Sequence, residues 1–248
     1  MTARADTKSA NVSWSAPATD GGSAITSYTV VPYIGAAAQS GTTVGASATA
    51  TRITGLTNGT SYTFRVLATN AAGDGPQSNA SGAVVPKHSL FDLATPATED
   101  SGDGAGVNLG VKFSSDVAGS VAGIRFYKSA ANTGTHVGSL WTQGGTLLAQ
   151  ATFTGESASG WQTVTFSTPV AITAGTTYVA SYHAPNGRYS VTRAQFGTTG
   201  VDNPPLRAPS NALTPNGLYA YGSSTAFPQS SFDGSNYWVD VLFDAAAP

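Results

Sequence analysis

Two segments place aromatic and charged side chains side by side in a pattern that suits sugar binding. In GIRFYK at 123–128, the apolar residues Ile124 and Phe126 alternate with Arg125 and Tyr127. Residues two apart in a strand share one face of a sheet, so a core built on Ile124 and Phe126 sends Arg125 and Tyr127 to the opposite face. We expect Arg125 and Tyr127 to face a partner.

The segment NYWVDVLF at 236–243 alternates in the same way. Its apolar positions are Tyr237, Val239, Val241 and Phe243. This face is predicted to be buried, which leaves Trp238 and Asp240 on the other side. His183 shares a face with Ser181, although the alternation there does not decide which face. The expected binding residues are therefore Arg125, Tyr127, His183, Trp238 and Asp240.

Aromatic rings offer flat apolar surfaces to a sugar, and charged groups form directional hydrogen bonds to its hydroxyls. The alternative is structural. Arg125 and Asp240 would then form an ion pair on the sheet, while Trp238 and Tyr127 would lie under a loop or against another domain. The sequence leaves both interpretations open.

Glu99, Asp100 and Asp103 gather just before a predicted strand. Calcium takes six to eight oxygen ligands from flexible acidic loops, so this cluster predicts a structural calcium site, with a hydrated turn as the alternative. The spacing differs from that of an EF-hand. No other cofactor is expected.

The sequence offers little support for catalysis. None of the histidines, His88, His136 and His183, lies in a recognisable nucleophile motif. Glycoside hydrolysis needs two carboxylates that flank one bond, and Glu156, the one isolated candidate, is expected in a solvated turn. We expect no enzyme; an unrecognised glycan hydrolase is the poorer alternative.

The sequence pattern predicts that all the elements that carry these residues are strands. Apolar residues recur with a period of two, and turn signals such as Asn58-Gly59 and Asp233-Gly234 separate them. The 248 residues include no cysteine and carry a net charge of −2, with 10% charged residues. A polyanion needs clustered Lys and Arg, so nucleic acid is not an expected partner. No apolar run has the roughly 20 residues of a membrane helix, and no signal peptide is recognised.

Residues 1–86 resemble a fibronectin type III domain, through VSWSAP at 12–17, GGSAITSYTV at 21–30 and the long segment GLTNGTSYTFRVLATNAAGDGPQS at 55–78. The resemblance implies a sandwich with Trp14 in its core and a tyrosine corner at Tyr62. It also implies a spacer role beside other domains. Pro86 has no amide hydrogen to extend a ladder, and we place the domain boundary there.

Residues 88–248 resemble a bacterial family without an assigned function, which is appended to secreted glycoside hydrolases and surface proteins. The carriers are NLGVKF at 108–113, GIRFYK at 123–128, NTGTHVGSLW at 132–141, GTLLAQATF at 145–153, SGWQTVTF at 159–166, TYVASYHAPNGRYS at 177–190 and NYWVDVLF at 236–243. This resemblance implies a larger antiparallel sandwich, jelly-roll-like or immunoglobulin-like, in an accessory role.

Three further features have less specific meanings. Trp141 and Trp161 are expected to pack in a core because an indole buries a large area. The segment 197–216, with four prolines, predicts an ordered loop or a lid. Tyr219, Tyr221 and Phe227 are expected to pack, with the rim of a site as the alternative.

Together these observations predict an all-β, monomeric fragment of a larger secreted or cell-surface bacterial protein, next to neighbouring domains. Its second domain would bind a polysaccharide. The alternative is a structural spacer or adhesion module that has no small-molecule site.

Overall fold

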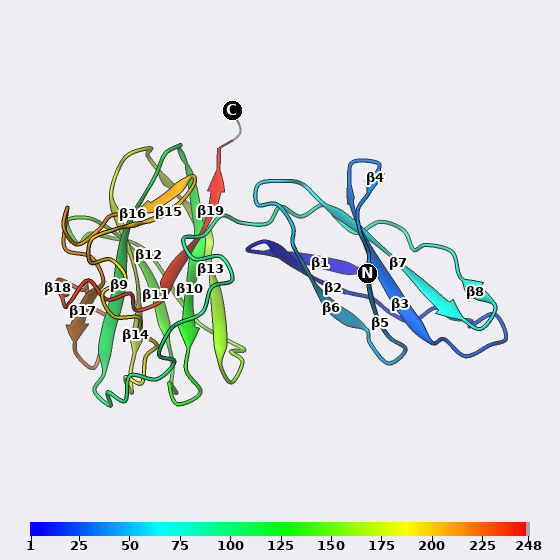
Figure 1. Ribbon diagram of the computed structural model, residues 1–248, viewed down its shortest axis with the longest axis horizontal. Coiled ribbons are helices and arrows are strands. Elements are labelled where there is room, and N and C mark those ends of the chain that lie inside the picture. Colours follow the sequence, from blue (N-terminus) through cyan, green and yellow to red (C-terminus); the bar gives the residue numbers. More distant parts are fainter. Residues whose placement is uncertain (247–248) are drawn as a thin grey trace. The chain divides into compact units, whose positions relative to one another are not determined.

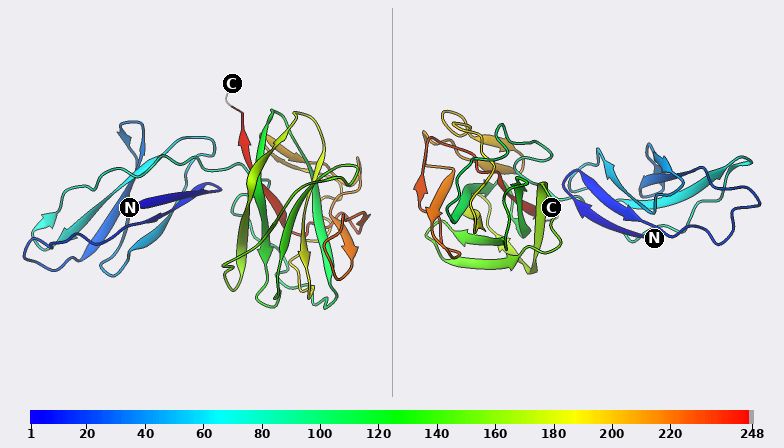
Figure 2. Two further views of the ribbon diagram at one scale, coloured as in Figure 1. Left: turned by 180° about the vertical axis from the view of Figure 1, so that it is seen from behind. Right: turned by 90° about the horizontal axis from the view of Figure 1, so that it is seen from below.

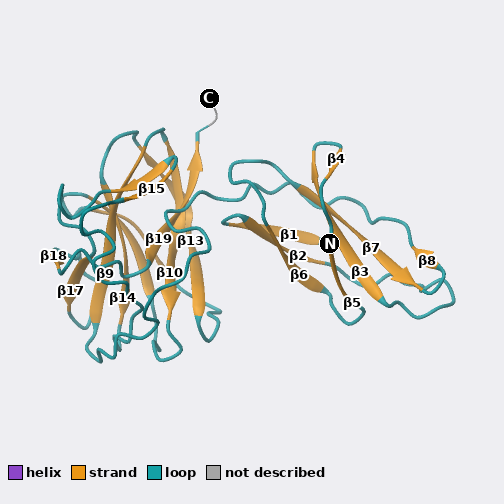
Figure 3. Ribbon diagram, viewed as in Figure 1, coloured by secondary structure: helices purple, strands orange, loops and turns teal. Residues whose placement is uncertain are grey.

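The computed structural model describes residues 1–246, and these residues form strands and loops without any helix (Figures 1 and 3). Accordingly, no helix in this range has the length and apolar character of a membrane span. The chain divides into two compact units, residues 1–87 and a second unit that begins at His88, one residue after the expected boundary. The all-β fold expected from the alternation is confirmed.

The first unit is a sandwich of two antiparallel sheets. One contains β1 (Thr2–Asp6), β2 (Ser9–Ser13) and β6 (Ala50–Thr54); the other contains β3 (Ser27–Ile34), β4 (Ala37–Ala38), β5 (Thr42–Gly45), β7 (Thr63–Asn70) and β8 (Gly73–Asp74). Trp14 is buried against Tyr28, with ring centroids 5.5 Å apart. The Tyr62 hydroxyl accepts a hydrogen bond from the backbone N–H of Thr57, as a tyrosine corner requires.

The second unit has a narrow sheet and a wide one. The narrow sheet has the order β13 (Gly160–Ile172), β10 (Gly119–Lys128) and β19 (Val239–Ala245). The wide sheet contains β9 (Val107–Ser115), β11 (Val137–Thr142), β12 (Leu147–Thr152), β14 (Tyr178–Ala184), β15 (Val201–Asn203), β16 (Leu206–Ala208), β17 (Leu218–Tyr221) and β18 (Ser230–Ser231). Figure 2 shows these strands from behind and from below, around a common interior.

The core of the second unit lies between the inner faces of these sheets. Ile124 and Phe126 point inward from β10, as the alternation predicts, and Leu109 and Phe113 point inward from β9. The ring of Phe126 stacks on Tyr182 with centroids 4.1 Å apart. Burying a large side chain of this kind stabilises a fold by about 1.5–3 kcal/mol, so apolar burial can hold the unit together without disulfides.

Candidate functional site

The outward location expected for Arg125 and Asp240 is wrong. Both side chains have 0% exposure, and they face each other across β10 and β19, with Nη1 3.8 Å from Oδ2. They do lie on the face opposite Phe126, but the segment after residue 88 covers that face. Backbone N–H groups of Leu90 and Phe91 donate to the Asp240 carboxylate at 2.7 and 3.1 Å.

The covering segment also contacts Arg125 directly. Arg125 Nη2 donates to the carbonyl of Asp92 at 3.1 Å. The Arg125 guanidinium also lies 4.2 Å from the centroid of the Trp161 ring. Burial raises the pKa of the Asp240 carboxyl, whereas the Arg125 charge and the backbone amides act in the opposite direction. The structural interpretation of this ion pair is therefore the one that the fold supports.

Trp238 is also covered, with 3% of its surface exposed. Its ring packs against Phe91 and Trp161, at centroid distances of 5.3 and 6.0 Å, and its Nε1 donates to Thr192 Oγ1. Tyr127 is half-buried at the edge of this cluster, 6.4 Å from Trp238. The expected sugar platform of Trp238 and Tyr127 is thus a packing cluster under a loop.

His183 belongs to a different sheet from Arg125, Tyr127 and Asp240. It lies on β14, between Val137 and Asn108 on the neighbouring strands. Its ring is buried, its Nδ1 has no hydrogen-bond partner among residues 1–246, and burial lowers its pKa. The five residues predicted to form one binding surface are therefore not brought together.

The three acidic residues expected to bind calcium turn toward different partners. Glu99 accepts a hydrogen bond from the Tyr127 hydroxyl, and Asp100 pairs with Arg188, whose hydrogen bonds lower the pKa of the Asp100 carboxyl. Asp103 accepts from the Tyr221 hydroxyl at 2.6 Å. Across the described part of the chain, no three His, Cys, Asp or Glu side chains gather as metal ligands. This arrangement does not fit the calcium site.

Glu156 is not the solvated turn carboxylate expected from the sequence. Its carboxylate lies 2.8 Å from Lys128 Nζ and 2.8 Å from Nδ1 of the fully buried His136. The other ring nitrogen of His136 lies 2.8 Å from Asn132 Oδ1. Because every polar atom of this cluster faces another protein group, we assign it to the stability of the fold.

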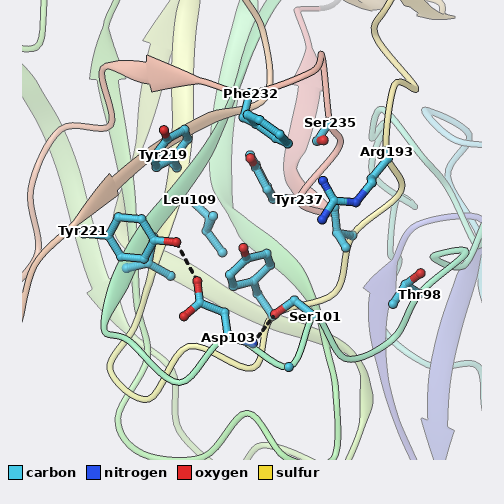
Figure 4. A pocket seen from close by; sticks show the side chains of 14 residues that line it. Thr98, Ser101, Asp103, Leu109, Arg193, Tyr219, Tyr221, Phe232, Ser235 and Tyr237 are labelled. Atoms are coloured by element: carbon cyan, nitrogen blue, oxygen red, sulfur yellow. Dashed lines mark hydrogen bonds between the residues drawn. The ribbon is translucent and has the colours of Figure 1, made fainter.

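A pocket of about 510 Å³ opens in the second unit (Figure 4). Its aromatic lining consists of Tyr189, Tyr219, Tyr221, Phe232 and Tyr237. Its polar side chains include Ser101, Asp103, Arg193 and Ser235. This combination of rings and polar groups makes the pocket the candidate site.

The pocket forms where the wide sheet extends beyond the edge of the narrow sheet. β17 extends the wide sheet beyond β9, and Tyr219 and Tyr221 pair with Leu109 and Val107. Cross-strand partners share a face, so both tyrosines point to the side of the core. The narrow sheet has only three strands, and loop segments 98–103, 189–193 and 232–237 frame the space on this side.

Backbone hydrogen bonds hold these loop segments in place. Ser101 N–H donates to the Tyr189 carbonyl at 2.8 Å, and Thr98 and Val191 exchange two hydrogen bonds. Thr192 and Asn236 form a second such pair, at 2.9 Å in both directions. Walls tied in this way are ordered before a ligand arrives, which lowers the entropy cost of binding.

The rings of the pocket meet edge to face. The centroids of Tyr189 and Tyr237 are 5.5 Å apart at 84°, and those of Tyr219 and Tyr221 are 5.7 Å apart at 72°. Tyr221 and Phe232 remain 59% and 55% exposed. The hydrogen bond to Asp103 raises the pKa of Tyr221, and burial raises that of Tyr237, so both hydroxyls are neutral at physiological pH.

Sequence reasoning found part of this site. Tyr221 lies at the rim of the pocket, which was the alternative for this residue. Phe227 packs as expected, 5.6 Å from Trp141 on the other face of the wide sheet. Tyr189, Arg193 and Phe232 were missed because each lies outside the strands, in or near a turn, where alternation carries no signal.

The fold and the pocket define a class of protein: two β-sandwich units, the second of which carries an aromatic-lined site. A family model described as a fibronectin type III domain matches residues 1–83, and one described as "Domain of unknown function (DUF4082)" matches residues 93–239. The second match covers more than half of the sequence, and the chain belongs to that family. Both resemblances are confirmed, and no catalytic family is among these matches.

Several solved structures are similar to parts of the chain. "Titin kinase and its flanking domains" is 34% identical over 35% of this chain and 17% of that one, with a TM-score of 0.29. The twitchin kinase region from C. elegans is 32% identical over 32% and 14%, with a TM-score of 0.28. The chitinase ChiA74 from Bacillus thuringiensis is 15% identical over 76% and 26%, with a TM-score of 0.27. The chain thus spans less than a third of the length of each.

Proposed function

We propose that the tyrosine-lined pocket binds a saccharide, and that the chain is a monomeric, non-catalytic accessory part of a larger secreted or cell-surface bacterial protein. Its role would be to hold neighbouring domains near a polysaccharide. The proposal rests on one observation above all: Tyr221 and Phe232 leave more than half of their surface open at the pocket, next to three further tyrosines.

The exposed aromatic rings and the ordered walls of the pocket favour a sugar-binding role over a purely structural one. Large apolar side chains exposed together mark interaction sites. A pocket of about 510 Å³ falls within the 300–1,000 Å³ that small-molecule sites occupy. The neutral tyrosine hydroxyls and Ser101 supply hydrogen-bonding groups that match sugar hydroxyls.

The lining also favours binding over hydrolysis. Glycoside hydrolysis uses two carboxylates on either side of the scissile bond. Among the described residues that line the pocket, Asp103 is the one carboxylate, and it already accepts hydrogen bonds from Tyr221 and from the backbone of Ala105.

Sedimentation with insoluble polysaccharides, followed by titration calorimetry on soluble fragments of those that bind, tests the proposal. We expect Tyr221→Ala and Phe232→Ala each to lower affinity at least about tenfold, which corresponds to about 1.4 kcal/mol. Tyr33→Ala is the control, because Tyr33 is a partly exposed tyrosine of the first unit, outside the pocket, and lies beside Arg65.

Two results would overturn the proposal. Binding that is unchanged in both pocket variants would place the sugar elsewhere. A protein that binds no glycan in the panel would leave the spacer or adhesion role in its place.

A further inference from the structure

Arg193 is the one arginine of the second unit without a carboxylate partner in the described residues. Arg125 pairs with Asp240, Arg188 with Asp100, and Arg207 with Asp116 and Asp202. Arg193 instead lines the pocket, where its guanidinium carbon lies 5.6 Å from the centroid of the Phe232 ring. Its hydrogen-bonding fork is therefore available to a ligand.

Ser235 is the second unusual group in the pocket. Its side chain is buried, with 1% exposure, and its Oγ has no hydrogen-bond partner within residues 1–246. Buried hydroxyls are nearly always paired, because a lost hydrogen bond to water must be replaced. A pocket-lining hydroxyl without a protein partner points to a ligand atom that completes it.

The backbone brings these two residues into the same part of the pocket wall. Thr192 and Asn236 exchange both of their hydrogen bonds as an antiparallel pair. Arg193 follows Thr192 and Ser235 precedes Asn236, so this bridge brings both residues to one wall of the pocket. In Figure 4, Arg193 and Ser235 lie on the side of Phe232, while Asp103 and Tyr221 lie across the pocket.

We infer that this pocket selects an acidic saccharide, whose carboxylate is held by Arg193 and Ser235 while its ring contacts the pocket aromatics. The inference rests on the proposed sugar-binding function and adds the chemical class of the ligand. The planar guanidinium matches a carboxylate with two parallel hydrogen bonds, and the Ser235 hydroxyl donates a third. The neutral tyrosines and Ser101 remain for the sugar hydroxyls.

The test compares polymers that differ in charge. Polygalacturonate, alginate and glucuronoxylan are measured beside methyl-esterified polygalacturonate and unsubstituted xylan as neutral counterparts, with dextran sulfate as a sulfated polymer. We expect at least one uronate polymer to bind about tenfold more tightly than the neutral polymers. This preference should shrink as salt rises, since an exposed Arg193 is screened.

Arg193→Gln should abolish the preference, and Arg193→Lys should restore only part of it, because an ammonium lacks the planar fork. Ser235→Ala should weaken uronate binding several-fold and leave neutral glycans unaffected. Arg65→Gln is the matched control, because Arg65 lies 5.7 Å from the Tyr33 ring in the first unit, and we expect no effect.

The outcomes separate this inference from the proposed function. Equal binding of neutral and acidic polymers that still depends on Tyr221 would sink the acidic ligand and leave sugar binding intact. Tight binding of the sulfated polymer alone would overturn the carboxylate assignment. No binding to any polymer would contradict both the acidic ligand and the proposed sugar-binding function.

Discussion

Arg125 and Asp240 lie opposite each other on adjacent strands, and neither side chain reaches solvent. The carboxylate also accepts three backbone hydrogen bonds, from Leu90, Phe91 and Val241. This pair therefore fastens the segment after residue 88 onto the narrow sheet.

Removing Asp240 should take away the carboxylate that faces the buried Arg125 guanidinium. We expect Asp240→Ala to lower the free energy of unfolding by about 3–5 kcal/mol, measured by urea denaturation. Asp116→Asn, which breaks an exposed pair with Arg207, serves as the control and should have no measurable effect. Equal losses in the two variants would contradict the structural role of the buried pair.

Stability should fall as the solution is acidified. Burial lowers the pKa of His136, and of His88 and His183, below the unfolded value of about 6.5. The unfolded chain therefore binds more protons, so the contribution is fully present above pH 6.5 and is lost as the pH falls toward the folded pKa. Urea denaturation between pH 7.5 and 5 should show this decline, and a shallower one in His136→Gln. Parallel curves would rule out His136 as a contributor.

Gly217 allows the loop of Ser235 to reach the wall of the pocket. Its φ is +69°, and a Cβ at this position would lie 1.7 Å from the Ser235 carbonyl oxygen. Gly175 has a similar φ of +70° but open space around it, so Gly175→Ala should cost only about 1–2 kcal/mol for its left-handed backbone. Gly217→Ala should cost clearly more and should also weaken glycan binding. A cost no greater than that of Gly175→Ala would argue against the close approach.

Calcium should not stabilise the protein. Glu99, Asp100 and Asp103 are directed to Tyr127, Arg188 and Tyr221, and they do not converge on one point. We therefore expect the Tm to be the same in millimolar calcium and in chelator. A rise in Tm that Asp103→Ala erases would instead show preferential binding to the folded state and restore the calcium site.

Alternation along single strands predicted the all-β fold, and it placed Arg125 and Asp240 on the face opposite Phe126. These are local properties, because the period of two is set by the geometry of one strand. The family resemblances were also readable from contiguous motifs, such as the one around Trp14 and the one that contains Tyr62.

What covers a face is not a local property. The segment that buries Asp240 lies about 150 residues earlier in the chain, and only the folded structure brings Leu90 and Phe91 onto it. The pocket likewise draws Asp103, Arg193 and Ser235 from three separate loops and Tyr221 from β17. Sequence spacing determined which way each strand residue points, whereas long-range packing decided which of those residues meets solvent and could meet a sugar.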